Sequence, residues 1–172
     1  MPTPVFIKID AEKQNVITAG ACDDKSIGTA WVDKHPEELI AHEVKHIVTV
    51  PTDPQSGQPS GQRVHKAFMF TCALNSAVPL MYNALTSGEQ LKKVDISWWR
   101  TADNGSQEHF FTTSLTEGTI VDINLHMPHA QDQNFSEFTQ LVTVSVAYAK
   151  IDWRHEISGK DGTDTWRAPI GH

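Results

Sequence analysis

The feature that most constrains this fold is a stretch of eleven residues, 51–61, between two segments of β-type sequence. It contains three prolines, two glycines and a single charge, and none of its side chains could anchor a hydrophobic core. Connections this long inside a compact domain are typically functional or disordered. The stretch consists of Pro51, Thr52, Asp53, Pro54, Gln55, Ser56, Gly57, Gln58, Pro59, Ser60 and Gly61.

The three prolines predict that this stretch is stiff. Each proline fixes φ and favours extended backbone, which lowers the entropy lost when a segment binds a partner. At full extension eleven residues could span about 36 Å. We therefore interpret residues 51–61 as an arm that holds a neighbouring surface. An ordinary long surface loop is the alternative that composition alone leaves open.

The length of 172 residues favours one domain covering residues 1–172, large enough to fold without disulfide bonds. The net charge is −7, from 14 basic and 21 acidic residues. This balance disfavours nucleic acid as a partner, because such binding depends on many Lys and Arg contacts to phosphate. Two cysteines, Cys22 and Cys72, provide no disulfide framework, and Cys72 fits a small buried hydrophobe in a strand.

The first ten residues lack the basic region and apolar run of a cleavable signal peptide. No segment of the sequence approaches the roughly 20 apolar residues of a membrane-spanning helix. We therefore expect synthesis in the cytoplasm and no membrane insertion. Export would need a route that does not read a cleavable signal.

Alternating apolar and polar residues predict a mainly β chain. Segment 38–50 is ambiguous between helix and strand, but its β-branched residues favour a strand for at least the second half. Residues 103–106, Asp-Asn-Gly-Ser, predict a tight hairpin turn. Residues 18–24 are expected as a loop, 33–38 as a turn and 116–118 as a bulge or bend. Further strands are expected at residues 5–9, 27–32, 64–74, 91–101, 107–127 and 138–148.

One helix is expected at residues 76–87, where apolar residues recur at helical spacing. Ser76 is the expected N-cap, and Gly88 is expected to end the helix. Six or more strands with one flanking helix predict a compact β-barrel or sandwich of two sheets, with the long loop extending from it. Strands of this length leave long unpaired edges, which a closed ring of head-to-tail copies would cover.

The residues His42-Glu43-Val44-Lys45-His46 match the zinc-protease pattern His-Glu-x-x-His. On a helix, this spacing places two imidazoles on one face beside a glutamate that acts as general base. On a strand, Glu43 points away from both histidines and that mechanism fails. A zinc metallohydrolase is therefore the alternative function, and it depends on a helix at this position.

A second possible metal-binding cluster comprises His126, His129 and Asp132, although Pro128 prevents regular ligand spacing. The sequence contains no nucleophile elbow, Walker loop or dinucleotide fingerprint. We therefore expect no enzymatic activity and no cofactor.

Several longer blocks resemble a known family. They are Met1-Pro-Thr-Pro, Arg63-Val-His-Lys, Ala77-Val-Pro-Leu-Met-Tyr-Asn-Ala-Leu, Gln107-Glu-His-Phe-Phe, Phe138-Thr-Gln-Leu, Lys150-Ile-Asp-Trp and Trp166-Arg-Ala-Pro. With these blocks the chain resembles Hcp, the ring-forming tube protein of bacterial type VI secretion. The resemblance extends from the first residues to the last of these blocks.

The resemblance implies a β-barrel that assembles as a homo-hexamer, with rings stacking into a tube inside a contractile sheath. It also implies secretion of the protein itself, contact with the spike protein VgrG, and small effectors held in the lumen. Under it, residues 51–61 correspond to the loop that docks on an adjacent subunit or ring. Some members carry a toxic domain after the barrel, and none is expected here.

Overall fold

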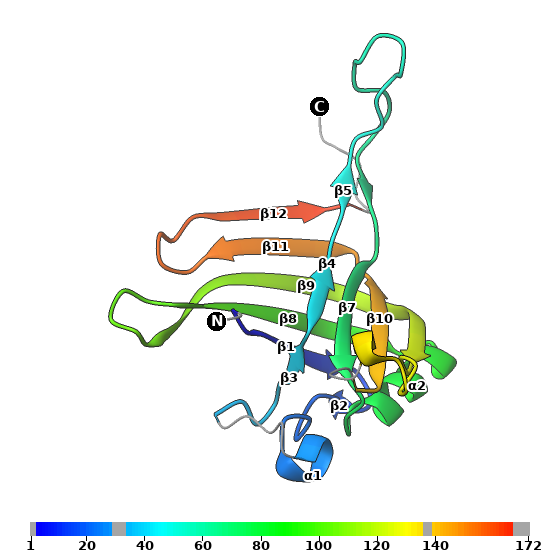
Figure 1. Ribbon diagram of the computed structural model, residues 1–172. Helices are drawn as coiled ribbons and strands as arrows, with labels where there is room; N and C mark the ends of the chain where they lie inside the picture. The colour runs from blue at the N-terminus through cyan, green and yellow to red at the C-terminus, as the bar shows by residue number, and fades with distance from the viewer. Residues whose placement is uncertain (1–2, 29–33, 136–138, 167–172) are drawn as a thin grey trace.

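The computed structural model describes residues 3–28, 34–135 and 139–166. Figure 1 shows a β-rich body from which a long hairpin projects at one end. The helices are α1 (Asp24–Ile27) and α2 (Val78–Ser87), with a 3-10 turn at Gln133–Phe135. The strands are β1 (Val5–Ala11), β2 (Asn15–Val16), β3 (Leu39–Ala41), β4 (Glu43–Lys45), β5 (Val48–Thr49), β6 (Val64–His65), β7 (Phe68–Ala73), β8 (Gln90–Thr101), β9 (Gln107–His126), β10 (Leu141–Ala147), β11 (Lys150–His155) and β12 (Asp161–Thr165).

Ten strands of the described residues form one antiparallel sheet with the main order β2-β1-β8-β9-β10-β7-β4. The sheet closes because β4 pairs with β7 while β3, directly before β4, pairs with β1. Strands β5 and β6 form a separate two-stranded sheet. The prediction of a mainly β fold with two sheets is confirmed, as is a strand structure in segment 38–50.

Strand β9 is the longest element, with 20 residues. One edge pairs with β8, whereas the other pairs first with β11 and then with β10. The change of partner occurs around Glu117, whose φ is 54°. This is the irregularity expected at residues 116–118, although the register shifts lie elsewhere, beside Trp98 and Ser145.

The interior is filled by inward-facing residues of β1, β7, β8 and β10 together with the inner face of α2. The buried side chains include Phe68, Phe70, Cys72, Val142, Val144, Val146, Val78 and Met81. Cys72 therefore occupies the apolar position expected from its strand pattern. None of the described helices is long and apolar enough to cross a membrane.

Two predictions about helices are wrong. Ser76 is not the N-cap of α2, because the helix begins at Val78 and Ala77 occupies the cap position. Instead, the Ser76 backbone N–H donates to Ser26 Oγ at 2.8 Å and its hydroxyl donates to the Gly20 carbonyl. Residues 24–27, expected as the end of a loop and the start of a strand, form the short helix α1, which ends at Gly28 with φ 62°. The remainder of the strand expected at 27–32 lies outside the described residues.

The hairpin of β11 and β12 was not predicted, because β12 reads Asp-Gly-Thr-Asp-Thr and lacks apolar alternation. Among the strands of the described residues, β12 pairs only with β11, and its side chains are exposed apart from the half-buried Asp164, so burial does not shape its sequence. The strand expected at residues 138–148 is found as β10, and its first expected residue, Phe138, lies outside the described residues. The helix end at Gly88, with φ 67°, and the turn at residues 103–106 are as expected.

Candidate docking arm and its anchor

The arm, residues 51–61, forms the outer part of the projecting hairpin in Figure 1. Its stem, residues 46–50 and 62–66, contains the short β5–β6 ladder, in which Val48 pairs with His65 and Thr49 with Val64. Beyond the ladder, a bridge joins Thr52 to Pro59. All eleven arm residues are exposed except the half-buried Asp53. The arm therefore extends away from the body.

The tip of the arm holds its shape through its own hydrogen bonds. Asp53 accepts from the Gln55 N–H at 3.0 Å and from the Ser56 hydroxyl at 2.9 Å. Its backbone carbonyl accepts from the Gly57 N–H at 2.8 Å, and Gly57 adopts φ 69°. The Gln55 N–H and the Ser56 hydroxyl lower the pKa of Asp53, so this carboxylate is charged at neutral pH.

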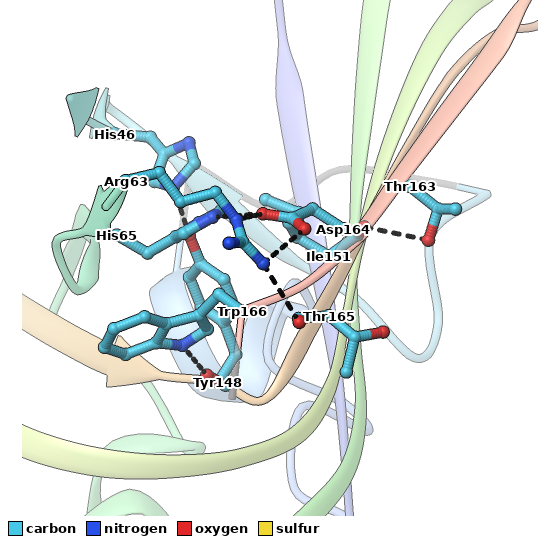
Figure 2. A network of polar contacts seen from close by, with 9 residues as sticks. All are labelled: His46, Arg63, His65, Tyr148, Ile151, Thr163, Asp164, Thr165 and Trp166. Carbon is cyan, nitrogen blue, oxygen red and sulfur yellow. Dashed lines mark hydrogen bonds and ion pairs between the residues drawn. The ribbon is translucent and has the colours of Figure 1, made fainter. Parts of the chain in front are cut away.

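The stem is attached to the body by a polar cluster, the anchor network, of Arg63, His65, His46, Tyr148 and Asp164 (Figure 2). Arg63 donates to both Asp164 oxygens, at 2.5 and 2.9 Å, and the bidentate geometry fixes its direction. His65 Nε2 lies 2.7 Å from Asp164 Oδ2, and His65 Nδ1 lies 2.7 Å from the Tyr148 hydroxyl. His46 Nε2 lies 2.6 Å from the same hydroxyl. Both strands of the stem are thus tied to residues about 100 positions away.

Trp166 completes the attachment from the C-terminal side. Its indole N–H donates to the Tyr148 carbonyl at 2.6 Å, and its ring lies 5.6 Å from the His65 ring. Arg63 also donates to the Thr165 carbonyl at 3.2 Å. The stem therefore contacts the junction of β10 and β11 and the end of β12. Both segments are far from the arm along the sequence.

Burial and charge act on the groups of the anchor network in different directions. The hydrogen bonds from Arg63 and His65 lower the pKa of Asp164, although partial burial opposes them. Burial, followed by the charge of Asp164, raises the pKa of the Tyr148 hydroxyl. Burial, followed by the proximity of His65, lowers the pKa of His46. At neutral pH the network therefore combines an ionised Asp164–Arg63 pair with a neutral Tyr148 and a neutral His46.

The stem also presents apolar side chains to solvent. Val48, Val50 and Val64 are 42%, 44% and 40% exposed. Scattered single apolar side chains are normal on a surface, but here Val48 and Val50 lie on one face of a narrow hairpin and Val64, opposite Thr49, lies on the other. The stem thus combines a polar attachment to its own body with apolar side chains that remain uncovered.

The structure does not support the zinc-protease alternative. Residues 39–45 form β3 and β4 in place of the helix that the pattern His-Glu-x-x-His requires. Glu43 is exposed on β4, while His46 is engaged by the Tyr148 hydroxyl. No three His, Cys, Asp or Glu side chains within residues 3–28, 34–135 and 139–166 form a metal-binding group.

The second histidine cluster also fails to converge. His126 ends β9, whereas His129 Nδ1 accepts from the backbone N–H of Gln131 at 3.3 Å. Asp132 Oδ1 accepts from the Asn134 N–H at 2.9 Å. Both side chains therefore stabilise the turn that carries them.

The fold and the arm define the class of this protein: a compact, closed β-barrel with a flanking helix and one extended, anchored loop. The chain belongs to the Hcp family, since the family model described as "Type VI secretion system effector, Hcp" matches residues 6–155. This agrees with the resemblance seen in the sequence.

Individual relatives support the same assignment. The chain is 46% identical over 170 residues to the "Major exported protein" of Pseudomonas aeruginosa, and the match covers 99% of both chains. A crystal structure of an Hcp protein superposes with a TM-score of 0.92 at 51% identity, covering 98% of this chain and 100% of that one. The secreted protein Hcp3 of Pseudomonas aeruginosa gives 0.83 at 39% identity, covering 97% and 100%.

Proposed function

We propose that this chain is a structural subunit of the type VI secretion tube, exported with the machine and assembled as stacked hexameric rings. The proposal depends on the arm, which docks on a neighbouring copy and so connects subunits or rings. In the same proposal the ring lumen holds small effectors, and the tube meets VgrG at its end and the contractile sheath outside. Membership of the Hcp family supports this role, as does the export stated in the name of the P. aeruginosa relative.

Three properties of the arm support docking. It extends away from its own body, so its surface is available to a second molecule. Its prolines and internal hydrogen bonds leave little conformational entropy to lose on binding. Its stem exposes Val48, Val50 and Val64, which would gain about 25 cal/mol for each Å² of apolar surface that a partner covers.

The test removes the tip of the arm without touching the barrel. Deleting residues 55–59 takes away no buried side chain, so we expect an unchanged circular dichroism spectrum and thermal unfolding of the monomer. Ring closure or stacking should weaken, as seen by sedimentation velocity at micromolar concentration and by negative-stain microscopy.

The matched control shortens a different exposed turn, residues 103–106 between β8 and β9. This variant should assemble as the unmodified chain does. Assembly that survives the deletion of residues 55–59 at every concentration tested would show that the arm has no docking role.

A further inference from the structure

The Tyr148 hydroxyl lies between two imidazoles, and this arrangement limits how many protons the anchor network can hold. His46 Nε2 is 2.6 Å and His65 Nδ1 is 2.7 Å from the same oxygen. A hydroxyl has one proton to donate and two lone pairs that accept. The two histidines therefore cannot choose their tautomers independently.

With both histidines neutral, one pattern of donors satisfies every contact. His65 Nε2–H donates to Asp164, which leaves His65 Nδ1 as an acceptor for the Tyr148 O–H. The Tyr148 oxygen then accepts from His46 Nε2–H. The donors and acceptors therefore follow one order. His46 donates to Tyr148, Tyr148 donates to His65, and His65 donates to Asp164 on β12.

One added proton can be accommodated. If His46 is protonated, the added N–H lies on a half-buried ring and the other hydrogen bonds of the network are unchanged. If His65 is protonated, the Tyr148 hydroxyl reverses and donates to His46 Nε2. Asp164 remains beside the new charge in the second case.

A second proton cannot be accommodated. Both imidazolium rings would donate to the same Tyr148 oxygen, two positive charges would meet there, and the Tyr148 O–H would lose its acceptor within the network. An unsatisfied buried hydroxyl and a buried like-charge pair are each unfavourable. Asp164 is the carboxylate that faces these rings, and its charge is already shared with Arg63.

We propose that the anchor network is an acid-sensitive latch: the stem stays attached while the two histidines carry at most one proton, and it detaches from the body when both are protonated. Detachment exposes both imidazoles to water, where each can take up its own proton. Where the attached state holds one proton, the detached state then binds one more, and linkage requires the detached-to-attached ratio to rise about tenfold for each unit that the pH falls.

The latch itself is a property of one chain, and only its consequence for assembly rests on the proposed docking function. If the arm docks on a neighbouring copy, a detached stem no longer directs it. Rings or stacks should then loosen in acid and remain intact at neutral pH.

The test measures the direction of the arm by electron paramagnetic resonance distances. Spin labels are placed at Ser56→Cys on the tip and Lys160→Cys on the body, both exposed positions, and labelled chains are diluted into unlabelled protein. The native cysteines do not interfere, because Cys22 and Cys72 are buried. We expect one narrow distance distribution at pH 7.5 and a broad second population that grows as the pH is lowered toward 5, by about tenfold per pH unit.

Two variants separate the mechanism from general acid damage. His46→Gln keeps an N–H donor for Tyr148 but cannot be protonated, so the narrow distribution should persist at pH 5. Tyr148→Phe removes the shared oxygen and should give the broad population already at pH 7.5. His42→Gln, outside the anchor network, is the matched control and should behave as the unmodified chain.

A distribution that does not change between pH 7.5 and 5 would overturn the latch. Equal acid broadening in the unmodified chain and in His46→Gln would overturn it too, because the second proton would then not matter. Sedimentation of the same samples tests the docking role separately. Rings that persist while the distance distribution broadens would uphold the latch and contradict the proposed docking of the arm.

Discussion

Asp164 accepts from both Arg63 and the Nε2–H of His65, so replacing it should destabilise the protein measurably. The two donors respond differently to its loss. The His65 side chain is 1% exposed, so its N–H would remain buried without a partner, which costs about 1–3 kcal/mol. The Arg63 side chain is 18% exposed and can turn toward water, which limits its share to about 1 kcal/mol or less.

We therefore expect Asp164→Ala to lower the free energy of unfolding by about 2–3 kcal/mol at pH 7. Asp164→Asn is the matched control, since its amide oxygen still accepts from His65 while the charge is lost, and it should cost about half as much. Urea unfolding followed by tryptophan fluorescence measures both. Protein concentration must be fixed and the oligomeric state recorded, because self-association adds to apparent stability.

The pH dependence gives a second check on the same residue. The pKa of Asp164 is lowered in the folded protein, so its contribution is present above the unfolded value of 3.8 and is lost as pH falls through the folded value. Measured in the His46→Gln background, in which the stem stays attached in acid, the gap between chains with Asp164 and with Asp164→Ala should thus stay constant from pH 7 to about 4.5 and narrow below pH 3.8. A loss under about 0.5 kcal/mol at pH 7, or a gap that does not narrow in acid, would refute this account of the network.

Three further substitutions test the barrel. Phe70→Ala empties a core position that is 1% exposed and should lower the free energy of unfolding by about 3–5 kcal/mol, whereas Val121→Ala, at 50% exposure, should change it by less than about 0.5 kcal/mol. Glu89→Ala removes a buried carboxylate that accepts from the backbone N–H groups of Lys13 and Gln14, and it should cost about 2–3 kcal/mol. Thermal and urea unfolding measure all three, and an effect of Val121→Ala as large as that of Phe70→Ala would contradict the packing described here.

Sequence patterns predicted correctly those helices, strands and turns whose conformation depends on residues close together in the chain. The alternation in β7 and β8, the helical spacing in α2 and the Asn104-Gly105 turn each specify a conformation over a few residues. The polar strand β12 escaped prediction because it carries no burial pattern. Ser76 was misassigned because its hydrogen-bonding groups are engaged by Ser26 and Gly20, distant in sequence, and not by the helix beside it.

In the candidate site, too, the features set by neighbouring residues were predictable and those set by distant contacts were not. The position, stiffness and exposure of the arm follow from its composition, and the structure places its residues together on one projecting hairpin. The anchor network could not be predicted, because Arg63 and Asp164 are separated by 101 residues and meet only once the sheet has closed. A charged residue and a histidine at alternate positions, Arg63 and His65, were the available signal, but nothing in the sequence identifies their partner.

A polar anchor explains how the stem can be held firmly while its apolar side chains remain uncovered. Had the stem been fixed by hydrophobic packing, Val48 and Val50, which share a face of the hairpin with His46 and His65, would have been its natural contacts with the body and would be buried. Hydrogen bonds are directional and the Arg63–Asp164 pair is bidentate, so a few contacts define the angle of the hairpin without using those valines. Attachment by hydrogen bonds also makes the position of the stem depend on protonation. When both His46 and His65 are protonated, both must donate to the one Tyr148 oxygen, and the network can no longer satisfy all of its hydrogen bonds.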